Sequence, residues 1–174
     1  MARFIGAILG AAHAATTINS NPLVDPFFCN GRVARILGDF FTGDVAQNDY
    51  VSLGYVGWDT RFDAISQLDF DDFGTSVTLD VGVASNTANV GATAPACLIS
   101  AQDIATAAGS VSLLKSVGIA NRHKPLWQLA GYASFQAAKD ATVADGSRAE
   151  LIATFKGADP VAGTLAWRIY GSPQ

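Results

Sequence analysis

Aspartates gather between residues 69 and 80, and their spacing partly matches a calcium-binding loop. If Asp69 is the first ligand, Asp71 is third, Gly74 sixth and Asp80 twelfth, as in part of the EF-hand pattern. However, Phe73 occupies the fifth position and cannot bind a cation, and the flanking residues follow a strand pattern. Aspartates and a glycine are also common turn residues. We therefore expect a structural corner here and no metal site.

The chain holds few residues that point to nucleophilic or acid–base catalysis. Its two histidines, His13 and His123, lie in an alanine-rich N-terminal segment and in a short basic run. No GxSxG, GxxxxGK[ST] or GxGxxG motif follows a strand pattern. A small hydrolase would require Asp69, Asp71 or Asp80 to converge in a cleft. We expect the protein not to be an enzyme and to have no catalytic residue and no cofactor.

The two cysteines do not form a zinc-binding or redox motif. Cys29 and Cys97 lie 68 positions apart, without a CxxC pair. A disulfide between them stays open as an alternative. The interpretation that we favour is two small buried side chains in a reducing compartment.

The charge of the chain disfavours nucleic-acid binding. The net charge is −4 and no basic stripe is present. The strongest basic run, Arg122-His123-Lys124, predicts a solvated loop, with phosphate binding as the alternative. Charged residues make up only 15% of the chain, which indicates a surface partly covered by protein partners.

Two segments with a period of two predict β-hairpins. In the segment 62–83 the return strand alternates between Val77, Leu79, Val81 and Val83 on one face and polar residues on the other. In the segment 149–170 a turn at 157–163 separates two alternating strands, and Trp167 lies on the apolar face of the second. Ser100 and Asp103 predict the N-terminus of one short helix that ends at Gly109. These elements predict an all-β fold, an antiparallel sandwich or jelly roll with one short helix.

Residues 1–49 are expected to form a largely irregular, extended N-terminal arm, and residues 50–174 the β-sandwich. Pro22 and Pro26 interrupt regular structure in the arm, and only the segment 33–37 has a weak strand pattern. The apolar run 4–12 is too short to span a bilayer, so we expect no membrane association. We interpret it as an arm that packs on an apolar surface, either of its own domain or of a neighbour.

Exposed aromatic residues are a further candidate feature, because β-sandwich lectins bind sugars on them. Trp167 is expected in the core. Trp58, in a Gly-Trp-Asp corner, is the candidate for a surface position, and a carbohydrate-binding adhesion module is the alternative that it supports.

Three segments of the sequence resemble small structural proteins of tailed bacteriophages. The first is LDFDDFGTSVTLDVG at 68–82, the second DIATAAG at 103–109 and the third AGTL at 162–165. They are similar to the family patterns LxxDDLGTGxTLxVGY, FxxxxDxxTAAG and GxxAxxGTL. The resemblance covers roughly residues 51–170 and leaves residues 1–49 uncovered.

The resemblance implies a capsid decoration or cement protein on the outer surface of the virion. It further implies binding to the major capsid protein at capsomer junctions, self-association as a homotrimer, and host cytoplasm as the location during assembly. A neck, tail or fibre-base protein is the alternative within the virion. We expect the partner-binding residues among Phe4, Ile5, Ile8, Leu9, Pro26, Phe27, Phe28 and Trp58.

Overall fold

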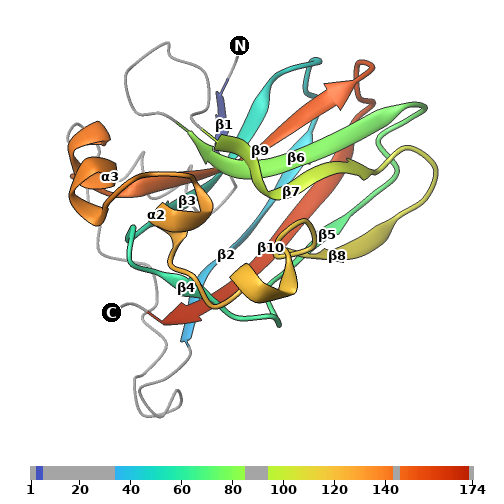
Figure 1. Ribbon diagram of the computed structural model, residues 1–174. Helices are drawn as coiled ribbons and strands as arrows, with labels where there is room; N and C mark the ends of the chain where they lie inside the picture. The colour runs from blue at the N-terminus through green and yellow to red at the C-terminus, as the bar shows by residue number, and fades with distance from the viewer. Residues whose placement is uncertain (1–2, 6–33, 85–93, 143–145, 173–174) are drawn as a thin grey trace.

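The computed structural model describes residues 3–5, 34–84, 94–142 and 146–172, which form a sandwich of two β-sheets (Figure 1). The first sheet has the order β1 (Arg3–Ile5), β3 (Tyr50–Val56), β9 (Ala149–Gly157), β6 (Val77–Ala84), β7 (Ala94–Asp103). The second has the order β2 (Ala34–Gly43), β10 (Gly163–Ser172), β5 (Gln67–Phe70), β8 (Gly109–Ser112). The short β4 (Arg61–Phe62) also pairs with β10.

The strand order is that of an eight-stranded jelly roll. One sheet holds β2, β10, β5 and β8, and the other holds β3, β9, β6 and β7, so that the chain passes repeatedly from one sheet to the other. The all-β sandwich predicted from the sequence is confirmed. All strand pairs are antiparallel except β1 with β3, which is parallel.

Both predicted hairpins are wrong in their pairing, although their strands exist. β5 pairs with β10 and β8, whereas β6 pairs with β9 and β7. Likewise, β9 lies in the first sheet and β10 in the second. Alternation along a strand fixes which face is buried, but it does not identify the strand that supplies the hydrogen bonds. Each segment therefore forms a connection between the two sheets.

Four connections between the sheets meet at one end of the sandwich, which we call the turn end (right in Figure 1). They are residues 44–49, 71–76, 104–108 and 158–162. The opposite end, which we call the helical end, carries the 3₁₀ helix η2 (Ile119–Asn121) and the helices α2 (Leu126–Leu129) and α3 (Phe135–Ala141). The strands thus separate two loop surfaces of different composition.

The core lies between the two sheets and follows the predicted alternation in β6 and β10, but not in β9. Val77, Leu79, Val81 and Val83 are fully buried, as the pattern of β6 predicts. β9 is buried on both faces from Ala149 to Phe155, and its Glu150 carboxylate accepts a hydrogen bond from Ser52 Oγ at 2.6 Å. A buried carboxylate requires such a partner, because desolvation without one is costly.

The helix predicted to start at Ser100 is absent, because this segment belongs to β7 and to the connection after it. Asp103 pairs with Thr78 in the sheet, and its carboxylate accepts a hydrogen bond from Ala105 N at 2.8 Å. The aspartate therefore closes a local turn and does not cap a helix. Ala107 and Ala108 are exposed and offer no apolar stripe for a helix to bury.

The helix with a side-chain N-cap is α3 at the other end of the molecule. Ser134 has extended backbone angles, and its Oγ accepts a hydrogen bond from Ala137 N at 3.1 Å. This is the usual geometry of a serine cap.

The sandwich begins before residue 50, where the sequence placed its boundary. β2 pairs along its length with β10, and its Leu37 and Phe41 are buried in the core. This part of the expected irregular arm is therefore a strand, and its apolar side chains form part of the inner face of the second sheet. The rest of the arm, except β1, lies outside the described residues.

Candidate functional site

The three segments that resemble phage structural proteins come together at the turn end. The first contains the connection from β5 to β6, the second the connection from β7 to β8, and the third the entry into β10. They are distant in the sequence but adjacent in space, because each links one sheet to the other at this end. The turn end is therefore one candidate site.

Backbone hydrogen bonds join these three segments directly. Phe73 N donates to Ile104 O at 3.0 Å, and Val161 N donates to Phe73 O at 2.8 Å. Asp71 N donates to Thr164 O at 2.9 Å, and in return Thr164 N donates to the Asp71 carboxylate at 2.9 Å. The turn end is thus one hydrogen-bonded unit.

The Phe73 ring anchors this unit in the core. It is fully buried and lies 5.0 Å from the Phe155 ring, centroid to centroid, at 59°. A Cβ atom at Gly163 would lie 3.0 Å from the Phe73 ring, so glycine permits the close approach. Gly157 has φ +84°, and a Cβ there would lie 2.1 Å from Ser76 O. Both glycines are required by the packing of the turns.

The aspartates considered for calcium do not point to one centre. Asp69 alternates with buried residues of β5 and pairs with Arg168 Nη2 at 2.8 Å on the outer face of the second sheet. Asp80 lies on the first sheet and accepts a hydrogen bond from Ala101 N at 2.7 Å. Outward-facing residues on opposite sheets cannot share a cation or a substrate. Within the described ranges, no group of three His, Cys, Asp or Glu side chains is placed to hold a metal ion.

Of the predicted partner-binding residues in the N-terminal arm, two have a described backbone. Phe4 and Ile5 lie in β1, where they pair with Val51 and Ser52 of the same chain. Their role in binding a partner stays a prediction. Ile8, Leu9, Pro26, Phe27 and Phe28 lie outside the described residues, as do Cys29 and His13.

Trp58, the remaining candidate, is not a surface residue. Its side chain is 1% exposed, and its Nε1 donates to Thr142 Oγ1 at 2.8 Å. Tyr132 packs edge-on against it at 5.0 Å. The helical end covers the corner that the sequence placed at the surface, so Trp58 offers no platform for a sugar ring.

Trp167 is buried in the core as predicted, at 1% exposure. Unlike Trp58, its Nε1 has no hydrogen-bond partner among the described residues. A buried indole N–H without a partner is unusual and loses the free energy of one hydrogen bond.

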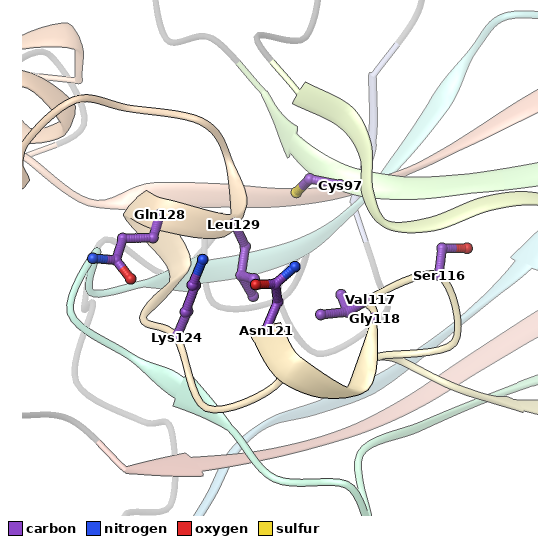
Figure 2. A pocket seen from close by; sticks show the side chains of 8 residues that line it. All are labelled: Cys97, Ser116, Val117, Gly118, Asn121, Lys124, Gln128 and Leu129. Carbon is purple, nitrogen blue, oxygen red and sulfur yellow. The ribbon is translucent and has the colours of Figure 1, made fainter.

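A pocket of about 180 Å³ opens at the helical end, between β7, η2 and α2 (Figure 2). The Asn121 amide and the Lys124 amino group extend from the segment below it, and the Cys97 thiol lies on the opposite side. Its lining consists of Cys97, Ser116, Val117, Gly118, Asn121, Lys124, Gln128 and Leu129. No acidic side chain is among them.

Cys97 carries a free thiol. Burial raises its pKa to about 12, although backbone hydrogen bonds from Val83 and Cys97 oppose this rise. The thiol is therefore protonated at neutral pH and is a poor nucleophile. It contributes a neutral wall to the pocket, not a reactive group.

The sequence did not single out this pocket. The run Arg122-His123-Lys124 was interpreted as a solvated loop, which holds for Arg122 and His123, since both are exposed. Lys124, however, is half-buried and lines the pocket. The preceding 3₁₀ turn and Pro125 turn it toward α2, and no periodic signal in the sequence marks that direction.

The large exposed apolar residues are dispersed over the described surface. They are Phe40, Ile65, Ile119, Phe135 and Val161, and they belong to different elements at both ends. Single exposed apolar residues are ordinary. Among the described helices, none has the length and apolar character needed to cross a membrane.

No protein-family model matches the chain, and no curated protein matches it. Among solved structures, the chain is similar to a chain of the Cyanophage Pam1 capsid asymmetric unit. The identity is 16%, the TM-score is 0.47, and the match covers 91% of this chain and 99% of that chain. The sequence identity and the TM-score are both too low for this likeness to bear on function.

Proposed function

We propose that the protein is a structural component of a tailed-phage virion, a decoration or cement protein that binds the outer shell at capsomer junctions. The observation that supports this most directly is the turn end. The three segments that resemble phage structural proteins are hydrogen-bonded to one another there. A chance resemblance in three unrelated stretches would not be expected to converge on one structural unit.

The jelly roll is compatible with this role, because viral capsid proteins are among those that use it. The fold alone does not determine function. A cement protein adds contact area across a junction between shell subunits. Buried apolar area contributes roughly 25 cal/mol per Å² before the costs of association, and repetition over the shell multiplies a modest interface. A chain with few charged residues suits such contacts.

The carbohydrate-binding alternative is no longer favoured by a specific observation. It depended on an exposed Trp58, and that side chain is buried against Thr142 and Tyr132.

The test is occupancy of the chain on particles assembled without it. Purified full-length protein is mixed with such particles, and the bound copies are counted by quantitative gel densitometry and located by electron cryomicroscopy. We expect saturation at hundreds of copies on the outer shell. A single ring of about a dozen copies at the neck would contradict the decoration role and favour the neck alternative.

A variant that lacks residues 1–30 tests the predicted arm in the same assay. We expect it to lose binding to the particles. Normal occupancy of the truncated protein would refute the assignment of Phe4, Ile5, Ile8, Leu9, Pro26, Phe27 and Phe28 as shell contacts.

A further inference from the structure

The pocket at the helical end presents hydrogen-bond donors that no described residue uses. The amino group of half-buried Lys124 makes no hydrogen bond or ion pair within the described part of the chain, and the same holds for the side-chain amides of Asn121 and Gln128. The neutral Cys97 thiol adds no negative charge. An ammonium group flanked by amides in a small pocket without acidic groups suits a carboxylate.

The two ends of the sandwich differ in charge. The turn end exposes five aspartates. Two described lysines lie near them: Lys156, which donates to Asn48 Oδ1, and Lys115, which donates to Gln102 Oε1 beside Asp103. The helical end carries Arg61, Arg122, Lys124, Lys139 and Arg148, against Asp59, Asp63 and Asp140. One end of the molecule is therefore complementary in charge to the other.

The aspartates of the turn end are not equally available. Four of them accept a hydrogen bond from a nearby or neighbouring backbone N–H: Asp71 from Thr164, Asp72 from Gly74, Asp103 from Ala105 and Asp159 from Gln47. Asp44 is exposed and makes no such bond to any described residue. Its carboxylate can therefore bind a partner without the loss of a hydrogen bond that holds a turn.

We propose, resting on the proposed function, that the pocket lined by Lys124 binds the Asp44 carboxylate of a second copy of this chain. Lys124 supplies the charge, and the neighbouring Asn121 supplies an amide donor to the same carboxylate. The contact joins the turn end of one subunit to the helical end of the next. Because the two surfaces differ, the interface is heterologous and closes as a ring when the rotation permits.

Sedimentation velocity of the full chain over a range of concentrations tests this contact, at about 0.1 M and about 1 M salt. We expect self-association at low salt that weakens at high salt. Lys124→Glu and Asp44→Lys should each weaken the association at least about tenfold. The double variant should restore it, because the exchanged charges again attract.

Matched controls are Lys139→Glu and Asp140→Lys, which make the same charge changes at the helical end outside the pocket. They should leave the association within about twofold of wild type. Thermal melts establish that each variant is folded, and Lys124→Gln serves as the milder variant if Lys124→Glu is unstable. Equal weakening by the control variants, or no restoration in the double variant, would overturn the proposal.

Titration with succinate separates a free anion from a protein carboxylate. If the wild-type chain stays monomeric at low salt but binds succinate, and Lys124→Gln abolishes that binding, the pocket takes a small carboxylate and the assignment to a second copy is overturned. The particle assay distinguishes the two proposals. A monomeric chain that still decorates particles overturns only the subunit contact, whereas a chain that self-associates but does not bind particles overturns only the decoration role.

Discussion

Replacement of Phe73 by alanine should destabilise the protein more than any change at the surface of the turn end. Its ring is fully buried against Phe155, and its backbone links two other connections between the sheets. Truncation of a buried phenylalanine costs about 3–5 kcal/mol, and the aromatic pair accounts for about 0.5–1.5 kcal/mol of such losses. We expect a total near the upper part of the first range.

The loss would be a large share of the stability of a domain of this size, which is typically about 5–15 kcal/mol. At about 2–4 °C per kcal/mol, Phe73→Ala should lower Tm by roughly 10–20 °C. Urea unfolding followed by tryptophan fluorescence measures the free energy directly. Val161→Ala is the matched control, because Val161 is 55% exposed in the same unit and should change the stability by no more than about 0.5 kcal/mol.

A loss below about 1.5 kcal/mol for Phe73→Ala would refute the reasoning. It would mean that the turn end relaxes into the space left by the ring, and that the hydrogen bonds of the connections hold the unit without its aromatic anchor. A large loss for Val161→Ala would have the opposite implication, namely that exposed parts of the turns carry stability.

Two further predictions concern buried polar groups. In urea unfolding, Trp58→Phe should lower the free energy of unfolding by about 1 kcal/mol or more beyond the loss caused by Trp167→Phe. Both substitutions remove the same volume, but only Trp58 Nε1 has a hydrogen-bond partner, Thr142. Equal losses of stability in the two variants would contradict this prediction. Burial raises the pKa of Cys97 from its ordinary value of 9.0 to about 12, so the folded state retains a proton that the unfolded state loses. Its contribution to stability is therefore complete below about pH 9 and is lost as the pH rises toward 12. Unfolding of wild type and Cys97→Ala should show a stability difference that changes across this interval, and a constant difference would count against a buried thiol.

The sequence alone predicted the all-β class and the buried faces of β6 and β10. Period-two alternation placed Val77, Leu79, Val81 and Val83 in the core, and it did the same for Trp167. This succeeds because a strand has only two faces, so apolar residues at alternate positions specify one dry side. Composition also disfavoured nucleic-acid binding, since no basic stripe occurs in the chain.

Predictions from the sequence were wrong where a local pattern is compatible with more than one structure. Asp103 suits a helix cap and a turn equally well, and only its pairing with Thr78 decided for the turn. Trp58 was placed at the surface because a Gly-Trp-Asp corner suggests a loop. The helical end, which is remote in sequence, buries it.

Tertiary structure alone decided the pairing of the strands and the positions of both candidate sites. β5 with β6, and β9 with β10, read as hairpins because they are adjacent in sequence, yet each pair spans the two sheets. Hydrogen bonds between strands are non-local, so their partners depend on how the whole chain closes its core. The same closure brings three separate motifs together at the turn end and turns Lys124 into a pocket beside Cys97. Neither arrangement leaves a signal in local sequence, because each depends on residues that become neighbours only after folding.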